Sequence, residues 1–325
     1  MNILFIGLLF IFVIVLVKAS DQVVTAIKHL SRNTESKTFM ISAILLAVAT
    51  SFPELSVAIT SSLEGSPHLS FGNILGANIA NITLVIGISA LISGKVNLRS
   101  DFVSNEVGVA ALAGIIPLVL SFDGSLSRVD GLILLAVYGA YTTSFFKIRF
   151  LKIAEGIRNQ SFMHKFFQRV TTTNINTNGT KEWGRLFVGI ALLLFSASMI
   201  VKVATQIASA FNMPLFLIGL VIVSIGTTLP ELAFSLRSLK DGEPTMYFGN
   251  VLGSIIANST LILGIASVIT PVTVFARNEA FLASIAFVLI YVAFWFFIRS
   301  KLRLDRWEAG VLLILYLIFI VVEFL

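Results

Sequence analysis

Two glutamates, Glu54 and Glu231, lie alone within long apolar segments, and each directly follows a proline. Their surroundings match, because residues 49–55 read Ala-Thr-Ser-Phe-Pro-Glu-Leu and residues 226–232 read Gly-Thr-Thr-Leu-Pro-Glu-Leu. A charge in the hydrocarbon layer of a membrane costs about 3 kcal/mol on insertion scales, and more in simulations. A chain that keeps two such charges in duplicate surroundings is predicted to use them to bind a cation.

The residues one or two turns before each glutamate supply further oxygen atoms. Each proline removes a backbone donor, so the carbonyl groups of the preceding turn need other partners in lipid. The candidate ligands are Ala47, Thr50 and Ser51 before Glu54, and Ser224, Thr227 and Thr228 before Glu231. Hard cations such as Ca²⁺ take about six to eight such oxygens. Neither break contains His or Cys, which disfavours zinc or copper.

A second segment follows each glutamate and carries glycines and asparagines on one predicted helix face. In the first copy it reads Gly-Asn-Ile-Leu-Gly-Ala-Asn-Ile-Ala-Asn over residues 72–81, and the second copy occupies residues 249–258. Glycines spaced by four permit close helix contact. Asparagines eight apart also share a face, so their amide oxygens are candidates to complete the site. These are Asn73, Asn81, Asn250 and Asn258; for Asn73 and Asn250, a hydrogen bond that pins two helices is an equal alternative.

Residues 49–93 and 226–270 form an internal repeat with a fixed offset of 177 and no gap. Twenty of the 45 aligned positions are identical, among them the Pro-Glu pair, the Phe-Gly-Asn triplet and the last asparagine. Chance similarity between apolar segments matches one aliphatic residue to another, but it does not match these polar residues in one register. The two blocks are therefore copies of one duplicated unit.

The composition indicates a polytopic membrane protein. The 325 residues are 57% hydrophobic and only 12% charged, against about 25% charged residues in soluble domains. Cysteine is absent, which excludes disulfides, thiolate metal sites and cysteine nucleophiles. Apolar runs of membrane-spanning length predict an all-α chain with ten transmembrane helices, at about 3–17, 40–63, 69–93, 107–122, 130–146, 186–203, 213–236, 246–270, 278–298 and 307–325.

The basic residues predict the orientation of these spans. With both termini outside, 20 of the 23 Lys and Arg residues fall in cytoplasmic segments, as the positive-inside rule favours. This distribution also explains the net charge of +6 without nucleic acid. Residues 147–185 then form a basic cytoplasmic linker between two five-helix halves, residues 1–146 and 186–325. The motif blocks run in opposite directions through the membrane, an inverted repeat with broken second and seventh helices that is typical of secondary transporters.

The two motif blocks resemble the alpha-repeats of the cation/calcium antiporter superfamily, and most of all the sodium/calcium exchangers of prokaryotic type. The resemblance rests on Thr-Ser-Phe-Pro-Glu-Leu with Gly-Asn-Ile-Leu-Gly-Ala-Asn-Ile-Ala-Asn, and on the second copy of both motifs. It implies a central calcium site with flanking sodium sites. The residues that it assigns to these sites are Ala47, Thr50, Ser51, Glu54 and Asn81 from the first copy, and Ser224, Thr227, Thr228, Glu231, Ser254 and Asn258 from the second.

The sequence departs from this family at two positions. Residue 258 is Asn where many exchangers carry Asp, and residue 77 is Ala where a hydroxyl is common and the second copy keeps Ser254. A protonated Asp and an Asn have nearly the same shape, so Asn258 is expected to preserve a calcium site with one titratable group fewer. The missing hydroxyl at Ala77 puts one sodium site in doubt.

The predicted function is exchange of Ca²⁺ for Na⁺ by alternating access, in a chain that acts as a monomer in the plasma membrane of a prokaryote. The two glutamates carry a charge of −2, which one Ca²⁺, two Na⁺ or two protons neutralise, so a Ca²⁺/H⁺ exchanger is the first alternative. A calcium-permeable channel is a more distant one. No enzymatic motif is present, such as His-Glu-x-x-His, and no cofactor is expected beyond the transported ions.

Overall fold

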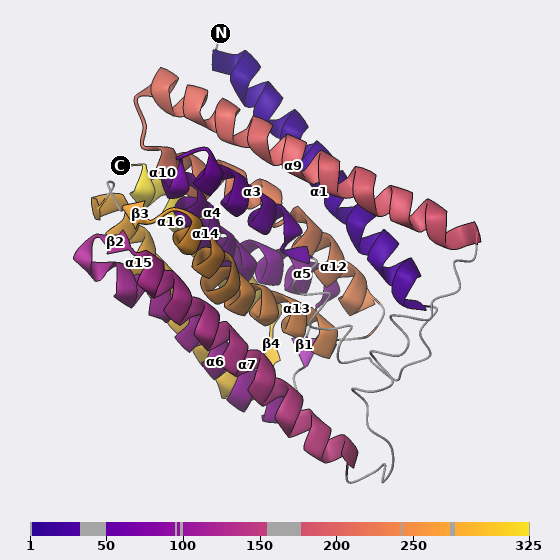
Figure 1. Cartoon of the computed structure of the whole chain (residues 1–325). Coiled ribbons are helices and arrows are strands. Elements are labelled where there is room, and N and C mark those ends of the chain that lie inside the picture. The colour runs from indigo at the N-terminus through magenta and orange to yellow at the C-terminus, as the bar shows by residue number, and fades with distance from the viewer. Residues whose placement is uncertain are drawn as a thin grey trace.

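The computed structural model describes residues 2–32, 50–94, 96–97, 100–154, 177–240, 242, 244–273 and 277–324, and these are almost entirely helical (Figure 1). The first half contains α1 (Asn2–Arg32), α3 (Phe52–Leu63), α4 (Pro67–Ala80), the π-helix η1 (Asn81–Val85), α5 (Ile86–Ser93), β1 (Val96–Asn97), α6 (Ser100–Leu120), the short 3₁₀ helix η2 (Ser121–Asp123), β2 (Ser125–Leu126) and α7 (Arg128–Ala154).

The second half contains a similar succession of elements. These are α9 (Thr177–Phe211), α10 (Leu215–Leu217), the π-helix η3 (Ile218–Val223), α11 (Ser224–Thr227), α12 (Leu229–Lys240), α13 (Pro244–Ile256), the π-helix η4 (Ala257–Ile262), α14 (Leu263–Ile269), β3 (Val272–Thr273), α15 (Arg277–Lys301), β4 (Arg303–Leu304) and α16 (Arg306–Glu323). The starts of α3, α4, α5 and α6 recur 177 residues later as the starts of α12, α13, α14 and α15. The sequence repeat is thus also a repeat of local structure.

Two short antiparallel strand pairs join the two halves. β1 pairs with β4, so that Val96 faces Leu304, and β2 pairs with β3, so that Leu126 faces Val272. In each pair, one strand comes from the first half and one from the second. The four strands therefore hold the ends of α5, α6, α14 and α15 in a fixed relation around the central helices.

The helices form a central group and a separate pair. α4, η1 and α5 are the most buried segment, and a large apolar cluster surrounds them with contributions from α6, α13, α15 and α16. α1 and α9 pack along each other over much of their lengths, and Figure 1 shows them together on one side of the molecule, with α6 and α7 on the other. A second apolar cluster lies beneath this pair and joins it to α3, α4 and η3 through Val57, Leu69 and Ile218.

Six of the described helices are long and apolar enough to cross a membrane. They cover Pro67–Ser93, Glu106–Asp123, Trp183–Phe211, Leu215–Lys240, Tyr247–Ile269 and Asn278–Lys301. These segments coincide with the predicted third, fourth, sixth, seventh, eighth and ninth spans. The predicted first and fifth spans fall within α1 and α7, and the predicted tenth span coincides with α16 up to Glu323, whereas residues 40–49 of the second span lie outside the described residues.

Two helices extend into the predicted linker. α7 continues to Ala154 and α9 begins at Thr177, so both ends of the segment 147–185 are helical, and residues 155–176 lie outside the described residues. Lys, Arg, Glu, Leu and Ala are good helix formers in water. The polar sequence that ends a membrane span therefore does not have to end the helix.

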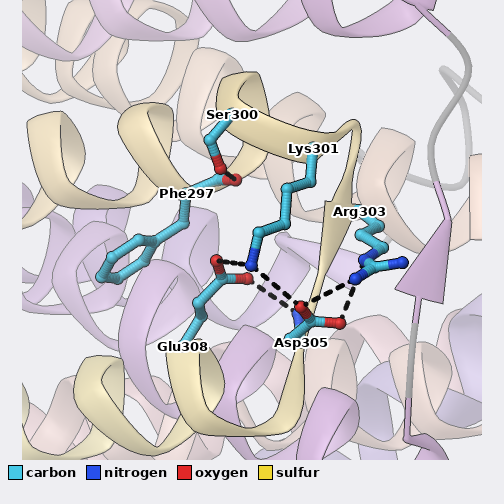
Figure 2. Close-up of polar contacts among 6 residues, drawn as sticks. All are labelled: Phe297, Ser300, Lys301, Arg303, Asp305 and Glu308. Carbon is cyan, nitrogen blue, oxygen red and sulfur yellow. Dashed lines mark hydrogen bonds and ion pairs between the residues drawn. The ribbon is translucent and has the colours of Figure 1, made fainter.

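The turn between α15 and α16 carries a compact group of charges (Figure 2). Asp305 is the N-cap of α16, and its backbone N–H donates to Glu308 Oε2 at 2.8 Å in a capping box. Lys301 Nζ lies 3.3 Å from Asp305 Oδ2, and Arg303 Nε lies 3.2 Å from Asp305 Oδ1. The cap satisfies backbone donors that the first turn of a helix leaves free, and the cations balance both carboxylates.

Candidate functional site

Both glutamates follow the same bend in the chain. Ser51 has φ −85° and ψ 12° before α3, and its counterpart Thr228 has φ −82° and ψ −1° before α12. After each bend the helical bonding resumes, because Leu55 N donates to Ser51 O at 3.0 Å and Leu232 N donates to Thr228 O at 3.1 Å. The proline in the first turn of each new helix is compatible with this arrangement, since that position needs no backbone donor. Glu54 and Glu231 thus occupy equivalent places one residue after it.

All of the described candidate residues are buried. Ala47 lies outside the described residues. The other twelve are at most 5% exposed: Thr50, Ser51, Glu54, Asn73, Asn81, Ser224, Thr227, Thr228, Glu231, Asn250, Ser254 and Asn258. Burying so many polar groups in an apolar protein is costly unless each finds a partner.

Three of the four oxygens of the two carboxylates lack such partners. Both oxygens of Glu54 and Oε2 of Glu231 have no hydrogen-bond partner among the residues that the structure describes. Ser51, three residues before Glu54, contacts Glu231 Oε1 at 3.5 Å, so the two bends meet. The hydroxyl of Thr227 lies 3.2 Å from Asn73 Oδ1 and 3.3 Å from Ser224 O. An ionised carboxylate cannot remain buried without compensation, so this pair needs a cation or protons.

The surroundings of the two carboxylates differ. Glu231 Oε1 accepts long hydrogen bonds of 3.5 Å from the hydroxyls of Ser51 and Ser254, which lie 3.3 Å from each other. The counterpart of Ser254 near Glu54 is Ala77, which has no hydroxyl. The departure noted in the sequence therefore leaves Glu54 without the donor that Glu231 has.

Two threonine–asparagine pairs link the copies symmetrically. Thr50 Oγ1 donates to Asn250 Oδ1 at 3.1 Å, and Thr227 Oγ1 can donate to Asn73 Oδ1 at 3.2 Å or to Ser224 O at 3.3 Å. Each pair joins the bend of one copy to the glycine-rich helix of the other. The amide oxygens of Asn73 and Asn250 are therefore engaged by hydroxyls, as the alternative of helix-pinning hydrogen bonds expects.

The hydroxyls of Ser224 and Thr228 bond to backbone carbonyls of their own segment. Ser224 Oγ donates to Leu220 O at 2.5 Å, and Thr228 Oγ1 lies 3.0 Å from Ser224 O and 3.1 Å from Ile225 O. The Ser224 carbonyl also accepts from Thr228 N at 3.0 Å. These carbonyls are thus satisfied partly by nearby hydroxyls, and the hydroxyl oxygens keep lone pairs for another ligand.

Asn81 and Asn258 both lie in π-helical segments, η1 and η4. Such segments are rare and occur frequently at functional sites. Neither polar atom of Asn81 has a partner among the described residues, and Asn258 Oδ1 lacks one as well. Asn258 Nδ2, by contrast, donates to Asn78 Oδ1 at 3.3 Å. Sequence reasoning missed Asn78, because its counterpart in the second copy is Ile255 and the repeat gives it no emphasis.

Close helix contact explains the glycines of the first copy. A Cβ atom at Gly72 would lie 2.1 Å from Phe216 O, and one at Gly76 would lie 1.9 Å from Leu220 O. Only glycine permits this approach of α4 to α10 and η3, which brings Ser224 and Asn73 into the same buried region. The predicted role in close helix contact is confirmed for Gly72 and Gly76 and is wrong for Gly249, where a Cβ would meet nothing within 4 Å.

The described residues contain no cluster of three or more His, Cys, Asp or Glu side chains able to hold a metal. The buried site instead offers two carboxylates with hydroxyl and amide oxygens. Hard cations accept such mixed oxygen sets, whereas zinc and copper favour nitrogen and sulfur. Because several of these oxygens are unpartnered and shielded from solvent, the residues present suit an alkali or alkaline-earth cation as substrate.

The fold and this buried oxygen site define a helical membrane protein that handles cations, and the comparisons with known proteins agree. The sequence profile of the sodium/calcium exchanger protein family matches residues 4–147 and 181–325. The chain belongs to this family, whose members are transporters and not enzymes.

Several relatives cover most of the chain. The inner membrane protein YrbG of Escherichia coli is 30% identical over 82% of this chain and 80% of its own length. The sodium/calcium exchanger MaX1 of Methanosarcina acetivorans is 28% identical over 99% of this chain and 97% of its own. Among solved structures, the sodium-calcium exchanger NCX_Mj soaked with Na⁺ and Sr²⁺ matches with a TM-score of 0.63 and 27% identity, over 99% of both chains.

Proposed function

We propose that this protein exchanges Ca²⁺ for Na⁺ across a membrane by alternating access. The observation that carries the proposal is the buried pair Glu54 and Glu231, whose oxygens lack enough partners to remain ionised without a bound cation. One Ca²⁺ neutralises the pair, and so do two Na⁺. Because both loads balance the same charge, the two ions compete for one site, which is the condition for coupled exchange.

The proposed calcium site contains both carboxylates and the neutral oxygens around them. Thr50 and Thr227 donate their hydroxyl protons to Asn250 Oδ1 and Asn73 Oδ1, and a hydroxyl that donates can also accept a cation. Ser51, Ser254, Asn81 and Asn258 supply further hydroxyl and amide oxygens. Ca²⁺ takes about six to eight oxygen ligands and tolerates irregular geometry, so such a mixed set of oxygens suits it.

Sodium as the driving ion is favoured by the printed names of MaX1 and NCX_Mj, both sodium/calcium exchangers. Two protons would neutralise Glu54 and Glu231 equally well, so a Ca²⁺/H⁺ exchanger is the second candidate. The observation that favours it is local: Ala77 lacks the hydroxyl that Ser254 keeps in the second copy, so one proposed sodium site loses an oxygen.

The proposed arrangement in the membrane has ten spans as two inverted five-helix repeats. The family profile matches two blocks that leave out residues 148–180, which fits halves at 1–146 and 186–325 with a cytoplasmic linker between them. The positive-inside distribution puts both termini outside the plasma membrane of a prokaryote. α1 and α9, which share their own apolar cluster, are the elements proposed to slide against the central helices in a monomer.

Calcium uptake into proteoliposomes tests this function. Purified protein is reconstituted, and labelled Ca²⁺ uptake is measured with an outward Na⁺ gradient, with a pH gradient alone, and with no gradient. Uptake that requires the Na⁺ gradient is expected. Uptake with the pH gradient alone would select the proton-coupled exchanger, whereas conduction without any counter-ion would select a channel. Absence of uptake under every condition would refute calcium transport.

A further inference from the structure

A three-residue hydrogen-bond chain crosses the protein interior beside the candidate site. Asn258 Nδ2 donates to Asn78 Oδ1 at 3.3 Å, and Asn78 Nδ2 donates to Ser259 Oγ at 2.7 Å. All three side chains are at most 2% exposed. The chain joins α4 to η4, which belong to different copies of the repeat. It uses the amide oxygen and the amide nitrogen of Asn78.

This chain holds the side chain of Asn258 in place. Its amide nitrogen donates to Asn78 Oδ1, and Asn78 in turn is bonded to Ser259, so Asn258 cannot swing away without breaking the link between the two copies. In this arrangement the oxygen of Asn258 points to the opposite side, where it has no partner among the described residues. Asn258 lies one turn after Ser254, whose hydroxyl contacts Glu231, so these two side chains share a helix face.

The counterpart of Asn258 has no such anchor. Asn81 occupies the same place in the first copy, but the residues that would hold it are Ile255 in place of Asn78 and Ile82 in place of Ser259. Neither isoleucine side chain can donate or accept a hydrogen bond. Accordingly, neither polar atom of Asn81 has a partner in the described part of the chain. The two copies thus differ in how firmly they hold equivalent amides.

We propose that Asn78 is a positioning residue that presents the Asn258 amide oxygen to the transported divalent cation. Asn258 is then held in its ligand position before the ion binds, whereas Asn81, which lacks such an anchor, is not. The inference rests on the proposed function. It also accounts for the neutral residue at position 258. An ionised carboxylate there could not donate to Asn78 Oδ1, which lies 3.3 Å from Asn258 Nδ2, whereas an amide donates without needing a bound proton.

Steady-state kinetics in proteoliposomes test this role. Asn78→Leu keeps the branched shape of the side chain and removes both of its hydrogen bonds. Loss of a residue that orients a metal ligand costs about tenfold or more in metal affinity. We therefore expect the calcium KM to rise at least about tenfold, with a smaller change in maximal rate. Ser259→Ala removes only the outer bond and is expected to raise the calcium KM by a smaller factor.

A double-mutant cycle separates positioning from a structural role. In an Asn258→Ala background there is no amide left to orient, so Asn78→Leu should change the calcium KM less than about twofold, because residues that act as a unit are not additive. Thr260→Val is the matched control, since Thr260 is equally buried in η4 but its hydroxyl donates only to Ile256 O. This control should leave the KM unchanged.

Three results would overturn the inference. An unchanged calcium KM in Asn78→Leu, with transport by the unaltered protein intact, contradicts it while leaving the proposed function in place. Independent, multiplicative effects of Asn78→Leu and Asn258→Ala show that Asn78 acts through another group. If the unaltered protein neither transports calcium nor binds it, as measured by titration calorimetry in detergent, the proposed function is refuted and this inference with it.

Discussion

Thr50 donates its hydroxyl to Asn250 Oδ1 at 3.1 Å, and 177 residues later Thr227 stands in the same relation to Asn73. The bend of each copy is thereby tied to the glycine-rich helix of the other. Because the contacts are exchanged, neither copy can build its side of the site alone. A hydroxyl that donates its proton in this way can also accept a cation, so in the proposed calcium site the same bond would both join the helices and orient a ligand oxygen.

These threonines provide the first prediction. Thr50→Val and Thr227→Val keep the shape of the side chain but remove the hydroxyl, so both the interhelical bond and the ligand oxygen are lost. A net loss of about 1 kcal/mol for the hydrogen bond alone corresponds to about a fivefold weaker interaction. We expect a rise in the calcium KM of at least about that factor. Thr50→Ser and Thr227→Ser, which keep the hydroxyl, should restore most of the affinity. Equal kinetics for the Val and Ser variants would show that the threonine hydroxyls do not contribute to calcium binding.

The second prediction concerns the charges of Glu54 and Glu231. Replacing either with Gln leaves one carboxylate, which cannot neutralise a divalent ion, so calcium exchange should be abolished. The protein should remain folded, and its thermal stability in a chelator should be unchanged or raised, because a buried charge without a partner has been removed. Tm in chelator and labelled calcium uptake measure the two effects.

Calcium should also lose its stabilising effect on these variants. A ligand at 100 times its Kd stabilises the folded state by about 2.7 kcal/mol, which should appear as a calcium-dependent rise in Tm in the unaltered protein but not in Glu54→Gln or Glu231→Gln. Glu64→Gln is the control, since Glu64 is exposed and its Oε1 contacts Ser198 instead. Near-normal exchange by either Gln variant would show that the corresponding carboxylate does not bind the ion.

The repeat made part of this structure predictable and left another part hidden. Features that occur twice at one offset were visible in the sequence, such as Glu54 with Glu231 and the glycines that let α4 approach η3. Features that occur once were not. Asn78 and Ser259 have Ile255 and Ile82 as counterparts, so no pattern singles them out, and their bond depends on two residues 181 positions apart.

The direction of individual side chains was also beyond the sequence. Spacing placed Ser224 with the hydroxyls of the second bend, but its Oγ donates to Leu220 O. Serine in a helix can bond to the carbonyl four residues before it, and spacing alone does not show whether it does. The end of α7 was also beyond the sequence. The apolar run ends at residue 146, but the helix continues through charged residues to Ala154.

The third prediction concerns the contact between α4 and η3. Gly76→Ala would put a Cβ 1.9 Å from Leu220 O, a backbone atom that cannot move alone. The two helices must separate, which disturbs Ser224 and the bond between Thr227 and Asn73. We expect a lower Tm and loss of calcium transport. Gly139→Ala in α7 is the control, since it meets nothing within 4 Å, and Ala is favoured over Gly in a helix by about 1 kcal/mol. Full transport by Gly76→Ala would contradict the close contact.

The last prediction uses the difference between Ala77 and Ser254. Ser254 and Ser51 both reach Glu231 Oε1, whereas Glu54 has no matching donor. Ala77→Ser would restore the hydroxyl in the first copy and add a neutral oxygen beside Glu54, of the kind that an alkali cation accepts. We therefore expect exchange to reach half its maximal rate at a lower Na⁺ concentration, with little change in the calcium KM. Ser254→Ala should have the opposite effect on sodium.

The control for these serine variants is Ala110→Ser in α6, which buries a hydroxyl at a position that is 0% exposed and belongs to none of the candidate residues. It should leave the sodium dependence unchanged. If exchange proves to be driven by protons, Ala77→Ser has a distinct meaning, because the added oxygen then supplies a ligand that the native chain lacks. Sodium-driven calcium uptake that appears only in Ala77→Ser would identify Ala77 as the residue that separates the two kinds of coupling. An identical sodium dependence for Ala77→Ser, Ser254→Ala and the unaltered protein would show that neither position contributes to a sodium site.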